Sequence, residues 1–167
     1  MHLLARPSRN RQNAKRSVEI NGFNLDLIRL LGENGEIPPA WYGIYAWRAI
    51  VKAAGLFGDK QIEEGYACLE KAVSYCEKIT TFKKGDLLDT GKKELLGGVM
   101  YEYGQGVIRL SDGTKEPIDY EWEMEYNASK LLYSLTASHG WEWFNSVRND
   151  ERFKEYVERV RRIVDKK

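Results

Sequence analysis

The feature that most constrains the fold is a pair of amphipathic segments between residues 38 and 79. The first begins at Pro38-Pro39, which the first turn of a helix tolerates because its N–H groups have no intrahelical partner. Gly55 and Gly58 end this segment, and Asp59 is placed to cap the next. In both segments apolar residues recur at helical spacing, namely Trp41, Ile44, Tyr45, Ala49, Val51 and Leu56, then Ile62, Tyr66, Leu69, Val73 and Cys76. The pattern predicts two antiparallel helices joined as an αα-hairpin.

Further helices are predicted on both sides of this hairpin. A first helix is expected over residues 9–31 and stops at the breaker run 32–35. Two more are expected over residues 141–147 and from Asp150 to about Val164. The first helix carries its apolar residues at helical spacing at Ile20, Phe23, Leu27, Leu30 and Leu31.

The periodicity changes from helical to alternating near residue 99. Residues 99–103 alternate between apolar or aromatic and other side chains, residues 104–106 contain two glycines, and 107–110 are again mostly apolar. Asp112-Gly113 then signals a tight turn. We expect a β-hairpin, with a third short strand near 114–118 as an extension, and a short helix around 86–96 before it. The predicted fold class is therefore mainly α, a helical-hairpin bundle with a β-hairpin inserted near residues 99–111.

Residues 119–126 fit two structures. Tyr120, Trp122, Met124 and Tyr126 alternate with acidic residues, which favours a strand. A helical stripe also passes through Tyr120, Met124, Ala128, Leu131 and Leu135, and acidic residues suit the first turn of a helix. We favour one helix from Asp119 to about Ser138 and keep the strand as the alternative.

The predicted αα-hairpin resembles a tetratricopeptide unit, in which small residues let two helices approach closely. Gly65, Leu69 and Ala72 match the small-large-small spacing of the second helix, and Ala49 and Ala53 stand at small positions of the first. The segment from Trp143 to Phe153 is similar to a sequence motif found near the end of many tetratricopeptide-type chains, with Glu151 in place of a proline. The resemblance implies a helical binding scaffold and no catalytic chemistry.

Length and charge suggest one domain with a basic N-terminal segment. The chain has 167 residues and a formal net charge of +1, so no global field attracts nucleic acid or an anionic membrane. We expect a single helical domain over residues 17–167, preceded by a basic tail or linker over 1–16 that could also be the first turns of a helix. A phosphate-contacting arm is the alternative reading of its basic residues Arg6, Arg9, Arg11, Lys15 and Arg16. No signal peptide or membrane span is found, and we expect a cytoplasmic protein.

No motif for a cofactor, a metal ion or a catalytic nucleophile is found in the sequence. The acidic run of residues 119–125 is more typical of a solvated surface than of an acid–base pair. An enzyme with an unfamiliar site around Glu121, Glu125 and His139 therefore ranks last among the functions considered. No cofactor and no metal are expected.

Aromatic residues are the unusual part of the composition, at 12% of the chain with five Trp and ten Tyr. Tryptophan and tyrosine are enriched in the hot spots of binding surfaces. We expect most of them in the core and some on a partner-binding surface. The candidates for that surface are Trp41, Tyr42, Tyr45 and Trp122, with Arg48 and Lys52 as polar partners. The predicted function is a non-catalytic module that binds a protein, a peptide or a second copy of itself, such as the sensing or assembly part of a regulatory protein.

Overall fold

The computed structural model describes residues 11–166, with side chains from Asn13 onward. The chain begins with α1 (Arg11–Leu31) and continues through the short 3-10 helices η1 (Glu33–Gly35) and η2 (Pro39–Trp41). Next come α2 (Tyr42–Gly58) and α3 (Ile62–Ile79), which pack along their lengths and confirm the predicted helical hairpin. Because α1 spans Arg11–Leu31, the boundary expected at residue 16 falls inside a helix.

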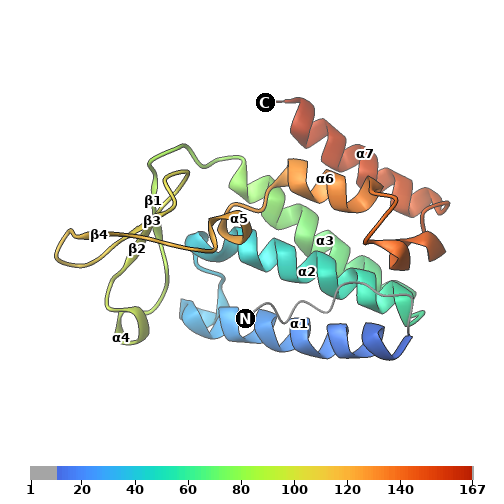
Figure 1. The fold of residues 1–167 in the computed structure, drawn as a ribbon, viewed down its shortest axis with the longest axis horizontal. Helices are drawn as coiled ribbons and strands as arrows, with labels where there is room; N and C mark the ends of the chain where they lie inside the picture. Colours follow the sequence, from blue (N-terminus) through green and yellow to red (C-terminus); the bar gives the residue numbers. More distant parts are fainter. Residues whose placement is uncertain (1–10, 167) are drawn as a thin grey trace.

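The helices form layers on both sides of this hairpin (Figure 1). On one side lies α1, which contacts α2, and on the other lie α6 (Ala128–Thr136) and α7 (Glu151–Asp165). The 3-10 helix η3 (Glu142–Ser146) connects α6 to α7 and packs against α2. Ion pairs link α7 to α3: the guanidinium nitrogens of Arg159 lie 2.8 Å from the carboxylate oxygens of Glu70 and of Glu77.

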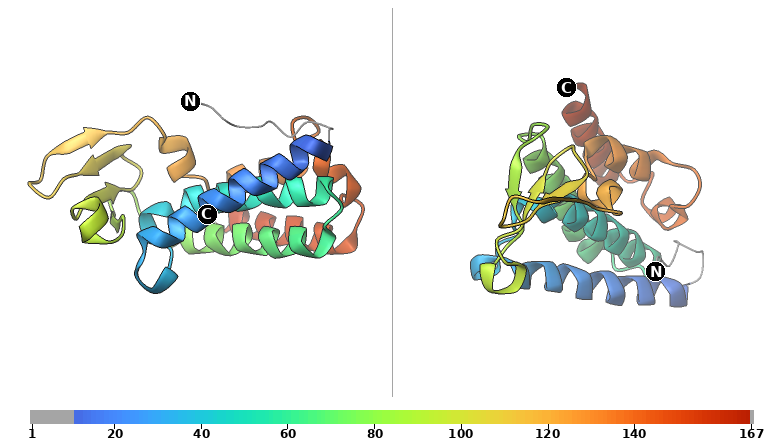
Figure 2. Two further views of the ribbon diagram at one scale, coloured as in Figure 1. Left: turned by 90° about the horizontal axis from the view of Figure 1, so that it is seen from below. Right: turned by 60° about the vertical axis from the view of Figure 1, so that its left-hand side comes forward.

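A small sheet projects from one end of the helical body (Figures 1 and 2). Within the described residues it has four antiparallel strands in sequence order: β1 (Leu87–Asp89), β2 (Met100–Glu102), β3 (Val107–Arg109) and β4 (Lys115–Pro117). The predicted hairpin corresponds to β2 and β3, and β4 is the predicted third strand. Tyr101 is fully buried at the centre, opposite Leu88 and Ile108.

The helix predicted around residues 86–96 is mostly wrong. Its first part is strand β1, and the helical part is confined to α4 (Lys93–Leu96). Gly91 separates the two with a φ of +126°, and a Cβ added there would lie 2.3 Å from the carbonyl oxygen of Leu31. The end of α1 also accepts a hydrogen bond from the N–H of Lys92 at 2.8 Å. A long-range contact with α1 thus decides where this segment turns.

The single helix predicted from Asp119 to Ser138 is also wrong, and so is the strand alternative. The segment forms α5 (Glu121–Met124) and, after a break, α6. The side chain of Asn127 caps α6 by accepting hydrogen bonds from the N–H groups of Ser129 and Lys130. Glu125, in the break, accepts hydrogen bonds from the Tyr101 hydroxyl and the Gly104 N–H, both at 2.6 Å. The break therefore joins the helical body to the sheet.

Close packing in the helical body depends on small residues in α2 and α3. A Cβ added at Gly65 would lie 2.6 Å from the ring of Phe57, and one added at Gly43 would lie 2.0 Å from the carbonyl oxygen of Met124. Gly65 therefore lets α3 approach α2, and Gly43 lets α5 approach it. The predicted cap at Asp59 is wrong: α3 begins at Ile62, and the Asp59 carboxylate instead accepts a hydrogen bond from the Gln61 amide at 2.8 Å.

Helix α1 has two apolar faces, and the predicted stripe is the outward one. The face against α2 contains small and polar residues among its apolar ones, namely Ala14, Ser17, Asn21, Leu25 and Ile28, all buried. On the outer face, Phe23, Leu27 and Leu30 are 64%, 43% and 62% exposed. At about 100° per residue, the centres of the two faces lie roughly 150° apart around the helix. We call Phe23, Leu27 and Leu30 the outer face of α1.

Two buried or half-buried tyrosines make the fold sensitive to alkaline pH. Burial raises the pKa of Tyr66 and of Tyr75 to about 12, above the ordinary value of 10. Above pH 10 the unfolded chain loses these protons while the folded chain keeps them, so the free energy of unfolding should fall as pH rises from 10 to 12. Urea denaturation across this range checks the expectation. A Tyr66→Phe, Tyr75→Phe double variant should show a shallower fall, and an equal slope would contradict the assignment.

Candidate binding surfaces

Three of the predicted partner-binding residues make contacts within the fold. The indole N–H of Trp41 donates a hydrogen bond to the carbonyl oxygen of Thr90 at 2.7 Å, which links η2 to the segment after β1. Tyr42 is half-buried and stacks on Phe82, with ring centroids 5.7 Å apart. Tyr45 is buried, and its hydroxyl accepts a hydrogen bond from Arg29 at 3.1 Å. The prediction that Tyr45 reaches the surface is wrong, because it faces the core side of α2.

The two predicted polar partners lie elsewhere on α2. Lys52 is half-buried, and its ammonium lies against Gly22 of α1. Arg48 is half-buried, where burial lowers the pKa of its guanidinium and the charge of Glu123 raises it. The six predicted residues therefore do not form one surface. All six lie within the described part of the chain. Trp122 is the most exposed of them, with 49% of its surface accessible to solvent.

Trp122 lies at an aromatic pocket of about 540 Å³ that sequence reasoning did not assemble. Its walls come from four places in the chain: α2, α5, α6 and the loop before η3. We call it the tryptophan pocket, and its lining residues are Trp47, Trp122, Ser129, Lys130, Tyr133, Ser134 and Trp141. The periodicity of α2 did place Trp47 away from Trp41 and Tyr45, but nothing local links Trp47 to residues 122 and 141.

Edge-to-face contacts fix the walls of this pocket. Trp47 stands at the centre, with its ring centroid 5.1 Å from that of Trp122 and 5.8 Å from that of Trp141, both in T-shaped arrangements. Such pairs are favourable beyond the area they bury. Trp141 is in turn stacked on the buried Phe144 at 5.5 Å. The deep walls are therefore held rigidly by the core, whereas Trp122 and Tyr133, which is 70% exposed, form the rim.

Lys130 supplies the charge of the pocket. Its ammonium donates hydrogen bonds to the carbonyl oxygens of Trp122 at 2.9 Å and Glu125 at 3.1 Å, and lies 4.9 Å from the centre of the Trp122 ring. Burial lowers the pKa of Lys130, and the carboxylates of residues 125, 121 and 123 raise it in part. The indole N–H of Trp47 is buried without a hydrogen-bond partner among the described residues. Among the described residues that line the pocket, Lys130 is thus the charged donor on mostly aromatic walls.

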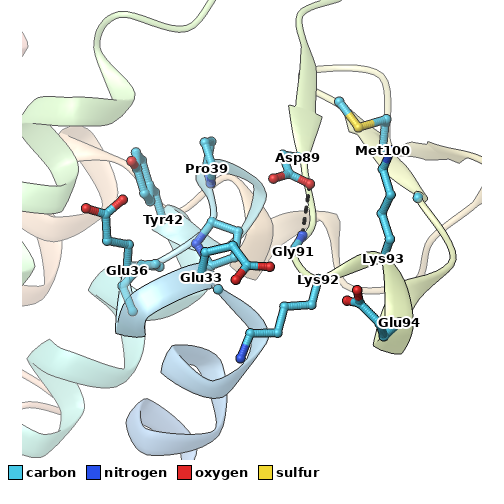
Figure 3. A pocket seen from close by; sticks show the side chains of 14 residues that line it. Glu33, Glu36, Pro39, Tyr42, Asp89, Gly91, Lys92, Lys93, Glu94 and Met100 are labelled. Carbon is cyan, nitrogen blue, oxygen red and sulfur yellow. Dashed lines mark hydrogen bonds between the residues drawn. The ribbon is translucent and has the colours of Figure 1, made fainter.

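A second pocket, of about 510 Å³, lies between the η1–η2 segment and the sheet (Figure 3). Glu33 and Glu36 come from one wall, and Asp89 and Glu94 from the other, with Lys92 and Lys93 among them. The carboxylate of Asp89 already accepts a hydrogen bond from the N–H of Gly91 at 3.0 Å. Among the described residues, no three His, Cys, Asp or Glu side chains are grouped closely enough to hold a metal ion. The charges of this pocket are mixed, and they single out no ligand.

The residues behind the two alternative functions are dispersed. Arg6 and Arg9 lie outside the described residues, as does the side chain of Arg11, while Lys15 and Arg16 are exposed on α1. Glu125 is held by the sheet, the carboxylate of Glu121 lies beside Gly106, and His139 is exposed in the loop between α6 and η3.

No protein family matches this chain, and comparisons with curated proteins and with solved structures found no match. Among the described helices, none is long and apolar enough to cross a membrane.

Proposed function

We propose that this protein is a non-catalytic interaction module that binds an apolar surface of another protein chain through the outer face of α1. The observation that carries the proposal is the exposure of Phe23, Leu27 and Leu30 in one stripe, at 64%, 43% and 62%. A contiguous apolar patch on the surface of a folded protein often marks a site where another molecule binds. Assembly within a regulatory protein is the biological role that fits such a module.

The spacing of the outer face indicates how a partner would bind. Residues 23, 27 and 30 repeat at intervals of four and three, which is the pattern by which one helix packs against another or lies in a groove. Arg16 lies in the same stripe one turn before Ile20, and Glu19 and Asp26 flank it on one side. A complementary partner therefore presents an apolar stripe, and a second copy of this chain satisfies that requirement as well as a different protein does.

The helical hairpin adds weaker support. Ala49, Ala53 and Ala72 are fully buried where α2 meets α3, and Gly65 contacts the ring of Phe57. These small residues stand at the positions expected for a tetratricopeptide unit. We propose that this resemblance applies to the α2–α3 hairpin and to no other part of the chain. In this view α2 and α3 are the scaffold, and α1 carries the binding face.

Introducing charge on the outer face should weaken association and leave the fold intact. We expect a Phe23→Glu, Leu30→Glu variant to keep its circular dichroism spectrum and thermal midpoint, because both side chains already face solvent. Its association should weaken at least about tenfold, since a carboxylate would be buried against an apolar stripe. Sedimentation velocity measures self-association, and affinity capture from cell extract followed by mass spectrometry measures binding of other proteins.

The matched control is Tyr120→Glu, which adds a carboxylate at another exposed aromatic residue. This variant should associate as the wild type does. The proposal is wrong if the wild-type protein sediments as a monomer and captures no protein, or if the outer-face variant associates as strongly as the wild type. Capture of nucleic acid at low salt alone would instead favour the basic arm.

A further inference from the structure

We propose that the tryptophan pocket binds a small planar aromatic carboxylate, with the ring against the walls formed by Trp47, Trp122 and Trp141 and the carboxylate on the ammonium of Lys130. This site is separate from the outer face of α1 and does not depend on the function proposed for that face. Its volume, about 540 Å³, falls within the range of roughly 300–1,000 Å³ that is usual for small-molecule sites.

The shape of the pocket favours a flat apolar ring. Trp122 and Trp141 each meet Trp47 edge to face, so the pocket is bounded by rings at steep angles to each other. Tyr133 adds a further ring at the rim from α6 and is largely exposed. An aromatic ligand can make stacked and edge contacts with such walls at the same time.

The charge of the pocket favours a carboxylate. Of the described residues that line it, Lys130 alone is charged. An ammonium has three donors, and the carbonyl oxygens of Trp122 and Glu125 accept two of them. No third hydrogen bond of this ammonium is found among the described residues, and the ammonium also lies 4.9 Å from the centre of the Trp122 ring. A ligand carboxylate would accept from the remaining donor, and a hydrogen bond between two charged groups is stronger than one between neutral groups.

The neighbouring carboxylates act on Lys130 through their charge, but each makes its closer contacts elsewhere in the molecule. Glu125 accepts hydrogen bonds from Tyr101 and Gly104 of the sheet region. The carboxylate of Glu121 lies beside Gly106, where an added Cβ would be 2.8 Å from its oxygen. The charge of Glu123 acts on Arg48 as well as on Lys130. None of the three lines the pocket among the described residues.

Three probes that share one ring and differ in charge test the proposal: 2-naphthoate, 2-naphthamide and 2-naphthylmethylamine. By isothermal titration calorimetry we expect 2-naphthoate to bind with a dissociation constant on the order of 0.1–1 mM. The neutral amide should bind about tenfold more weakly, and the cationic amine more weakly still. In the ¹⁵N–¹H spectrum, 2-naphthoate should shift the indole resonances of Trp47, Trp122 and Trp141, whereas that of Trp41 should stay in place because Trp41 does not line the pocket.

Two variants separate the ring contact from the charge contact. Lys130→Met should weaken 2-naphthoate about tenfold and leave 2-naphthamide unchanged, which also shows that the pocket still forms. Trp122→Ala should weaken both probes, and Tyr120→Ala, outside the pocket, should weaken neither. Tighter binding of the amine than of the carboxylate would overturn the proposal, and so would binding that leaves the three indole resonances unmoved.

Discussion

Replacing Phe144 by alanine should lower the free energy of unfolding by about 3–5 kcal/mol, because it leaves a cavity at the junction of three helices. Phe144 is fully buried in η3. Its ring lies 6.0 Å from that of Phe57 in α2, 5.5 Å from that of Phe153 in α7 and 5.5 Å from that of Trp141. Chemical denaturation of the wild-type protein and of the Phe144→Ala variant, at the same pH and salt, measures the difference in the free energy of unfolding.

The matched control for this prediction is Tyr133→Ala, which removes an aromatic ring that is 70% exposed. A surface substitution of this kind should change the free energy of unfolding by no more than about 0.5 kcal/mol. A loss below about 1 kcal/mol for Phe144→Ala would mean that η3 is not part of the cooperative core.

Replacing Arg148 by methionine should lower the free energy of unfolding by about 3 kcal/mol. The guanidinium donates hydrogen bonds to the carbonyl oxygens of Leu135, Ala137 at 2.7 Å and Trp141 at 3.2 Å. These carbonyl groups end α6 and form the loop after it, so they have lost their helical partners. Methionine keeps most of the apolar stem but leaves these acceptors without a charged donor, and each such loss costs about 1–3 kcal/mol when it is not repaired by water.

Arg161→Met is the matched control, because Arg161 is exposed on α7 and pairs with Glu158 one turn away. Pairs of this kind contribute roughly 0.3–0.5 kcal/mol. Denaturation curves should therefore separate the two variants clearly. Amide hydrogen exchange should also rise between residues 137 and 147 in the Arg148 variant alone. Equal stability of the two variants would show that solvent replaces the Arg148 contacts without cost.

Local pattern was sufficient for the helices that have one apolar face. The stripe from Ile62 to Cys76 and the one from Phe153 to Val164 each predicted a helix close to its observed bounds. The alternation after residue 99 likewise predicted β2 and β3. In these segments the spacing of apolar residues and the turn chemistry agree, so the local sequence was enough to predict the helices and strands.

The tryptophan pocket could not be predicted from local sequence patterns. Its walls combine Trp47 with Trp122 and Trp141, which lie about 75 and 94 positions further along the chain. The aromatic surplus did indicate that some rings would reach the surface, and Trp122 does. Periodicity assigns a residue to a face of its own helix, but it contains no information about which other helix that face meets.

What the sequence by itself determined is the mainly helical class, the αα-hairpin and the central strands, because each depends on contacts between residues near in the chain. Tertiary structure decided the rest. It determined which of the two apolar faces of α1 is buried, because the smaller side chains of the Ala14 and Ser17 face allow a closer approach to α2 than Phe23 and Leu27 would. It also divided residues 119–138 into two helices, at the break where Glu125 accepts hydrogen bonds from the Tyr101 hydroxyl and the Gly104 N–H.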